Sequence, residues 1–173
     1  SMSESIKTII RTRSGRMQAA DVFLLNAPYN GGTHLPDVTV ITPVFDREGR
    51  RVLFYVAARG HHADIGGLTP GSMPPDSRVV EEEGVLIDNF QAVDRGRFLE
   101  AEVEALLRSG RYPSRNPAQN IADLKAQIAA CEKGVQELRR MVDEFGLDVV
   151  HAYMKHVQDN AEESVRRVLG KLR

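Results

Sequence analysis

The C-terminal third of the chain carries a long apolar repeat at helical spacing, and this repeat constrains the fold more than any other feature. Apolar side chains recur in steps of three and four residues from Ile121 to Phe145. This spacing aligns them along one face of a long helix. Asn116-Pro117 supplies an N-cap followed by a proline at the first helical position, and Gly146 is suited to end the helix. We therefore predict one continuous helix over 117–145, with Cys131 in its apolar seam.

A second apolar stripe begins directly after Gly146 and runs from Leu147 to Val168. Two amphipathic stripes separated by one glycine predict an antiparallel helical hairpin over 117–169. At the other end of the chain, Ser3 is a candidate N-cap for a short helix that stops near Gly15.

β-branched and aromatic runs of strand length fill the region between residues 21 and 58. The runs are 22–25, 38–41 and 52–56, with a turn over 46–50, and a further short strand is expected at 85–87 and a helix at 96–108. The predicted fold class is α+β, with a small, mostly antiparallel sheet in the N-terminal half and a long C-terminal α-helical hairpin. We expect a single domain over 1–173, divided into an N-terminal helix (1–16), strands and glycine-rich site loops (21–90) and a helical part (96–173).

Composition excludes several classes of function. A net charge of −1 gives no reason to expect nucleic acid as a partner. No run approaches the roughly 20 apolar residues of a membrane span, and a single cysteine suits a reducing compartment. The expected location is therefore the cytoplasm, without a membrane partner, and a homo-oligomer stays open. Neither GxxxxGK[ST] nor GxGxxG occurs, so the chain has no recognisable nucleotide site.

Two polar clusters lie in glycine-rich loops next to predicted strands. They are His34-Leu35-Pro36-Asp37 and His61-His62-Ala63-Asp64. Imidazole and carboxylate are the ligand types of zinc, manganese and iron sites. The same residue types also cap turns and form Asx-turns beside Gly and Pro. Spacing alone leaves both interpretations open.

The loop that follows the second cluster is rich in glycine. Gly66, Gly67 and Ser72 offer backbone N–H groups that an anionic group would use, although a surface Ω-loop explains the same composition. In the acidic run 81–83, only Glu83 stands directly before a glycine and is singled out.

Several of these segments resemble the hydantoinase B/oxoprolinase family, in the right order along the chain. The matching segments are 26–37, 59–67, 70–75, 115–117, 123–127 and 146–150. The Arg-Gly-His-His form at 59–62 looks most like the 5-oxoprolinase branch. The resemblance runs from about Asp21 onward and corresponds to a central segment of a longer family subunit.

The resemblance implies ATP-dependent opening of a cyclic amide, in which 5-oxoproline, ATP and water give glutamate, ADP and phosphate. In this family a hydantoinase A-like subunit or domain binds ATP and Mg, so the chain is expected to be inactive without that partner. Relatives that carboxylate acetone or acetophenone use a metal in the B part.

The resemblance also assigns roles to individual residues. It implies metal ligands at His34, Asp37, His61 and Asp64, with the metal left open among zinc, manganese and iron. It implies catalytic roles for His62 and Asp64. The implied substrate-binding residues are Tyr29, Gly66, Gly67, Ser72 and Glu83.

One position departs from the family pattern. The family usually has Asn-Asp-Pro-Tyr where this chain has Ala27, and loss of a carboxylate that orients a ligand would lower activity. Two alternatives stay open. The first is a carboxylase-type ligase subunit, which activity with bicarbonate and a ketone would reveal. The second is a non-catalytic partner-binding fragment, which a folded protein without metal would favour.

Overall fold

The computed structural model describes residues 1–172 and divides into two compact units, Ser1–Lys133 and Gly134–Arg173. Its class is α+β, as predicted, with a five-stranded sheet in the N-terminal half and long C-terminal helices. The elements are α1 (Met2–Arg13), β1 (Val22–Leu25), η1 (Pro28–Asn30), β2 (Asp37–Phe45), β3 (Val52–His61), η2 (Val80–Glu82), β4 (Phe90–Asp94), β5 (Arg97–Phe98), α2 (Glu100–Leu107), α3 (Pro117–Phe145) and α4 (Leu147–Lys171).

The sheet has the strand order β3-β2-β1-β4-β5, and every neighbouring pair is antiparallel. The hairpin of β2 and β3 is its longest part, with a register that runs from Asp37 opposite His61 to Phe45 opposite Val52. The predicted turn closes this hairpin, since the Asp46 N–H donates to the Arg51 carbonyl and the Arg50 N–H to the Asp46 carboxylate. The turn therefore fixes which residues meet at the far end of the two strands.

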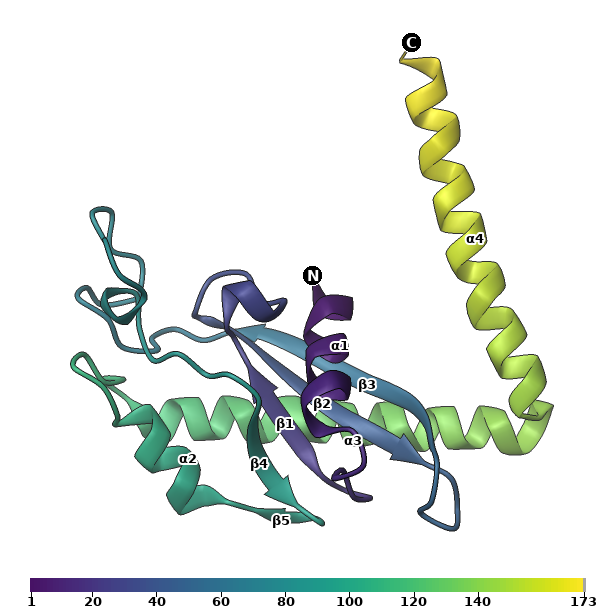
Figure 1. The fold of residues 1–173 in the computed structure, drawn as a ribbon, viewed down its shortest axis with the longest axis horizontal. Coiled ribbons are helices and arrows are strands. Elements are labelled where there is room, and N and C mark those ends of the chain that lie inside the picture. The colour runs from purple at the N-terminus through teal and green to yellow at the C-terminus, as the bar shows by residue number, and fades with distance from the viewer. Residues whose placement is uncertain (173) are drawn as a thin grey trace. The chain divides into compact units, whose positions relative to one another are not determined.

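Helices cover both faces of the sheet in the first unit (Figure 1). On one face, Ile9 of α1 packs with Phe23, Leu25 and Ile41. On the other face, Val38 and other strand residues pack with the apolar stripe of α3. The two faces follow from the alternation of side chains along each strand.

The continuous helix predicted over 117–145 is confirmed by α3. The first half of its apolar stripe, from Ile121 to Cys131, is buried in the core beneath the sheet. Burial raises the pKa of the Cys131 thiol, while contacts with Thr42 and the Ala58 backbone partly offset the rise. Cys131 is therefore a core residue, as its place in the seam predicts.

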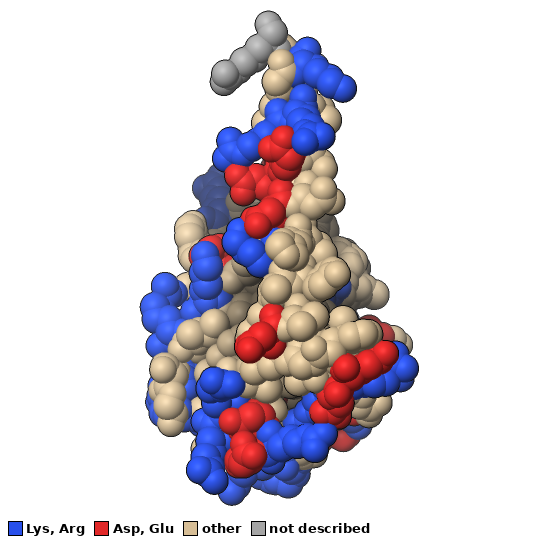
Figure 2. Space-filling view, turned by 90° about the vertical axis from the view of Figure 1, so that its right-hand side faces the viewer, with Lys and Arg blue, Asp and Glu red and all other residues tan. Residues whose placement is uncertain are grey.

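The second unit holds the end of α3 and all of α4. Gly146 separates the two helices with a φ of 85°, and its N–H donates to the Val142 carbonyl. Apolar side chains of α4 such as Tyr153 and Val157 are exposed. Acidic and basic side chains lie next to one another near the C-terminal end of the chain (Figure 2). Arg166 and Glu162 form an ion pair on α4. Within residues 1–172, no helix has both the length and the apolar character that crossing a bilayer requires.

Three local expectations are corrected. Residues 85–87 are not a strand; β4 comes later, at 90–94. The helix expected from residue 96 starts at Glu100, because Arg97 and Phe98 first pair with β4 across a turn at Gly96. The cap of α1 is Ser1 rather than Ser3.

Residues 85–87 do not join the sheet; a buried asparagine side chain, Asn26, and a few backbone hydrogen bonds to residues 26, 27 and 65 hold them in place. Asn26 is fully buried, and its amide donates to the carbonyls of Leu35 and Val85 over 2.9 Å each. Its side-chain oxygen accepts from the N–H of Ile87 over 2.6 Å. Asn26 therefore links the end of β1, the first histidine loop and the segment before β4.

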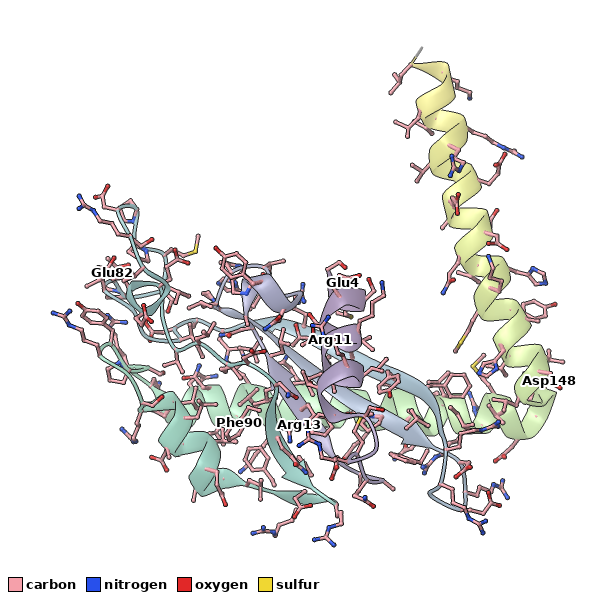
Figure 3. The ribbon with its side chains drawn as sticks, viewed as in Figure 1. Glu4, Arg11, Arg13, Glu82, Phe90 and Asp148 are labelled. Atoms are coloured by element: carbon pink, nitrogen blue, oxygen red, sulfur yellow. The ribbon has the colours of Figure 1, made fainter. Side chains whose placement is uncertain are left out.

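A second tie joins α1 to the same region. The Arg13 guanidinium donates to the side-chain and backbone oxygens of Asn89 and lies over the ring of Phe23. Arg13 and Phe90 are labelled in Figure 3, where they lie at the end of α1 and the start of β4. The N-terminal helix is thereby fixed to the sheet.

We predict that Asn26→Ala lowers the free energy of unfolding by roughly 3 kcal/mol, because it leaves buried backbone groups without partners. Urea unfolding at neutral pH measures the effect. Asn30→Ala, in the same loop, removes only an exposed hydrogen bond to Asp88 and should cost about 0.5 kcal/mol or less. Equal losses in the two variants would contradict the structural role given to Asn26.

Candidate metal centre

Three of the predicted ligands, His34, Asp37 and His61, come together at one point. The Nδ1 atom of His34 lies 2.8 Å from Asp37 Oδ2, and Nδ1 of His61 lies 3.0 Å from Asp37 Oδ1. The two imidazole centroids are 5.1 Å apart. One potential ligand atom from each residue lies within 4.8 Å of the others. We call this group the His34–Asp37–His61 cluster.

The strand register creates the cluster from distant parts of the sequence. Asp37 and His61 are directly opposite each other in the β2–β3 ladder, and opposite residues of an antiparallel pair project to the same face. His34 joins them through a turn in which the Asp37 N–H donates to the His34 carbonyl over 3.0 Å. Two ligands thus sit on strands and the third on a turn.

The Asp37 carboxylate is the centre of the cluster. Partial burial alone would raise its pKa, but hydrogen bonds from Thr33 and His61 and the nearby imidazoles outweigh burial and lower the pKa. The Thr33 hydroxyl donates to Asp37 Oδ2 over 2.7 Å. Asp37 is therefore ionised at neutral pH, as a metal ligand must be.

The donor set fits a first-row divalent cation. Two imidazole nitrogens and one carboxylate are the ligand types of catalytic zinc and related sites, which leave further positions open. Bond lengths of about 2.0–2.2 Å place neighbouring ligand atoms roughly 3–3.5 Å apart. The spacings of 2.8 and 3.0 Å join the two imidazoles to different oxygens of Asp37, and the three ligand atoms lie within 4.8 Å of one another, so the side chains would draw slightly closer around a cation. The His34 and His61 side chains are 36% and 55% exposed, so solvent reaches the cluster.

Asp64, the fourth predicted ligand, is not part of the cluster. Its carboxylate accepts from the backbone N–H groups of Gly66, Gly71 and Arg115 over 2.9 to 3.1 Å. It also pairs with the Arg115 guanidinium over 2.8 Å. Four donors occupy the lone pairs of a carboxylate, so Asp64 holds its own loop against the segment before α3.

His62, the predicted catalytic histidine, is buried at 1% exposure behind the cluster. Its Nδ1 lies 3.0 Å from the Asn120 amide nitrogen, and its Nε2 lies 3.1 Å from the Gln127 side-chain oxygen. The partners assign Nε2 as the protonated nitrogen and Nδ1 as the acceptor. Burial lowers the pKa of His62, partly offset by Gln127 and Asp123. Both nitrogens of a neutral ring are thus engaged within the protein.

The glycine-rich loop uses its own N–H groups internally. The N–H of Gly67 donates to the Tyr112 carbonyl over 3.0 Å, and a Cβ on Gly66 would lie 2.3 Å from that carbonyl oxygen. The buried Ser72 hydroxyl accepts from the Ile65 N–H and donates to the Gly66 carbonyl. These contacts favour the Ω-loop interpretation over an anion site.

The two remaining predicted substrate residues lie on exposed or half-buried segments. Tyr29 is fully exposed on η1. Glu83 accepts a hydrogen bond from the Ser77 hydroxyl over 2.9 Å. Ala27, where the family pattern has an aspartate, is buried and precedes η1 without a side-chain cap.

Two polar residues on α3 were not singled out from the sequence. Asn120 and Gln127 are seven residues apart, on the same helical face as Leu124 and Cys131. Asn120 also donates to the Asp64 carbonyl over 2.8 Å. A polar residue that interrupts a buried apolar stripe needs a buried partner. This interruption of the α3 stripe is the sequence feature that could have identified Asn120 and Gln127.

We predict that Asp64→Asn lowers the free energy of unfolding by roughly 2 kcal/mol at pH 7, because the variant cannot accept all of the donors. Burial alone would raise the pKa of Asp64, but the hydrogen-bond donors lower it by more than burial raises it. The pKa in the folded protein therefore lies below 3.8, the ordinary value for an aspartate. The resulting stabilisation is present above about pH 4 and disappears as pH falls through the folded pKa.

Urea unfolding between pH 7 and pH 3 should therefore show the gap between wild type and Asp64→Asn narrowing below about pH 4. Asp76→Asn, at an exposed position of the neighbouring loop, is the control and should follow the wild type. A gap that stays constant with pH would refute the ionic role of Asp64.

The chain matches known proteins over nearly its whole length. The family model for hydantoinase B/oxoprolinase matches residues 1–173. A 5-oxoprolinase of Dictyostelium discoideum is 48% identical over 98% of this chain, which covers 13% of that protein. The chain thus spans a small part of the length of this relative.

Solved structures show the same fold. An ATP-dependent caprolactamase from Pseudomonas jessenii is 30% identical with a TM-score of 0.81, over 95% of this chain and 28% of that one. A nucleotide-free acetone carboxylase shares the fold at 19% identity, with a TM-score of 0.73 over 86% of this chain and 19% of that one. The family match extends over the full length, and the chain belongs to the hydantoinase B/oxoprolinase family.

Proposed function

We propose that the His34–Asp37–His61 cluster binds a divalent metal and that the chain is the metal-holding segment of an ATP-dependent cyclic-amide hydrolase of the 5-oxoprolinase type. The observation that carries the proposal is the convergence of two imidazoles on one ionised carboxylate at a solvent-accessible strand end. Zinc, manganese and iron all accept this donor set.

The proposed division of labour follows from chemistry. An amide is a poor electrophile, and phosphorylation of its oxygen by ATP creates a good leaving group. A hydantoinase A-like partner in the same cytoplasmic enzyme supplies this ATP and Mg step, since the chain carries neither of the two phosphate-binding sequence motifs. A cation in the cluster supplies Lewis acidity toward water or a substrate oxygen. Within this chain, the Asp37 carboxylate and the imidazoles of His34 and His61 would hold the cation together.

Sequence identity favours a cyclic amide over a ketone as substrate. The 5-oxoprolinase of D. discoideum is 48% identical to this chain, and 5-oxoproline is a five-membered cyclic amide. The caprolactamase neighbour is described as ATP-dependent. The acetone carboxylase, at 19% identity, supports the fold alone.

We predict that the purified chain, loaded with Zn²⁺, Mn²⁺ or Fe²⁺ and dialysed, retains about one metal per chain for the preferred ion. His61→Ala should reduce the retained metal at least tenfold, because one of three ligands is lost. Elemental analysis measures the content. His156→Ala, on the exposed surface of α4, should retain the wild-type amount, and so should Asp64→Asn. Retention of full metal content by His61→Ala would rule out the cluster as the site.

We further predict that the chain alone neither hydrolyses ATP nor binds it with micromolar affinity. Combined with a hydantoinase A-like partner, it should release phosphate in a 5-oxoproline-dependent manner, and His61→Ala should slow this release about 100-fold or more. Ala27→Asp should raise the rate. Phosphate release coupled to acetone and bicarbonate instead of 5-oxoproline would favour a carboxylase.

A further inference from the structure

Gln127 of α3 contacts both strands of the hairpin that carries two cluster residues. Its amide nitrogen lies 3.0 Å from the Val38 carbonyl of β2 and 3.4 Å from the Ala58 carbonyl of β3. Its oxygen lies 3.1 Å from Nε2 of the buried His62. One side chain therefore bridges β2, β3 and the segment that follows β3.

These contacts are made next to the cluster but on the opposite face of the sheet. Val38 follows Asp37, and His62 follows His61. Because side chains alternate along a strand, Val38 lies in the core beneath α3, whereas Asp37 projects to the other face. Gln127 thus holds the backbone of the cluster strands from behind.

The chain leaves room for this contact. Gly60, which pairs with Val38, has no side chain on the face of Gln127. A Cβ at Gly60 would lie 2.9 Å from the Gln127 amide nitrogen and 3.0 Å from its carboxamide carbon. Any larger residue at position 60 would displace the amide.

His62 extends the contact into the rest of the loop. Its other ring nitrogen meets the Asn120 amide, which also donates to the Asp64 carbonyl. Asn120 in turn accepts from the buried Ser114 hydroxyl. His62 and the Asp64 carbonyl are therefore fixed to α3 through buried and half-buried hydrogen bonds, and such bonds are costly to leave unmade.

We propose that Gln127 is a positioning residue for the metal centre: through Val38, Ala58 and His62 it sets the separation of Asp37 and His61 before the metal arrives. This inference rests on the metal role proposed for the cluster. Gln127 does not touch the metal. It acts through the backbone of β2 and β3, as outer hydrogen-bond partners tune ligand geometry in metal sites.

The test is the affinity of Gln127→Met for Zn²⁺ and Co²⁺. Methionine keeps the length of the side chain and removes its hydrogen bonds. We expect a loss of affinity of about 10- to 100-fold, measured by competition with a chromophoric chelator well below the melting temperature. A Co²⁺ visible spectrum altered in shape would report changed ligand geometry, which a loss of stability alone does not produce.

Two controls separate positioning from stability. Gln136→Met makes the same exchange at an exposed position of α3 and should bind as the wild type does. Ile128→Val removes a buried methyl group from α3, lowers stability without touching Gln127, and should also bind normally. If Gln127→Met does not fold, Gly60→Ala displaces the same amide by contact and should weaken binding at least threefold.

The outcomes distinguish this inference from the proposed function. Failure of the wild-type chain to bind either ion would overturn the metal role itself. Wild-type binding that His61→Ala abolishes, together with unchanged affinity in Gln127→Met or Gly60→Ala, would overturn only the positioning role of Gln127.

Discussion

The pairing register of β2 and β3 is the constraint on which the rest of the site depends. It places Asp37 opposite His61, and a slip of one residue would send one of these side chains to the other face of the sheet. The turn at Asp46–Arg51 and the burial of alternate residues such as Val38 and Val40 both enforce this register. Asp37 and His61 are thus positioned by the same contacts that fold the sheet.

One buried and one half-buried polar side chain then hold the loops around the strand ends. Asn26 ties the loop of His34 to the segment before β4, and Asp64 ties the second loop to Arg115. Neither residue belongs to the cluster. The first loop receives a hydrogen bond from Asn26 at the Leu35 carbonyl, and the second donates its Gly66 and Gly71 N–H groups to Asp64, so these polar groups are paired within the protein.

The elements set by local periodicity were predictable from the sequence. The apolar spacing and the flanking Asn116-Pro117 and Gly146 gave the bounds of α3, and β-branched runs with a turn gave the β2–β3 hairpin. The strand expected at 85–87 was wrong, because that segment is held by the Asn26 side chain and by a few backbone hydrogen bonds to residues 26, 27 and 65 rather than by a strand ladder. Its apolar composition does not reveal this.

The candidate site was predictable in part. A histidine and an aspartate beside a strand indicate ligands, and His34, Asp37 and His61 do converge. Asp64 has the same residue type and a similar glycine-rich setting, but it accepts hydrogen bonds from its own loop. Composition cannot distinguish a carboxylate that faces a metal from one that forms an Asx-turn, because the difference lies in the path of the following backbone.

The absence of Asp64 from the cluster has a chemical consequence for the proposed function. Three protein ligands leave a position for water or substrate, whereas a fourth would give the closed coordination of a structural site. Asp37 and His61 are held on paired strands, while His34 sits on a turn beside Thr33. A cation bound there would be held by two ligands on paired strands and by one on a turn. The exposure of the two imidazoles is therefore consistent with a centre that exchanges ligands during a reaction.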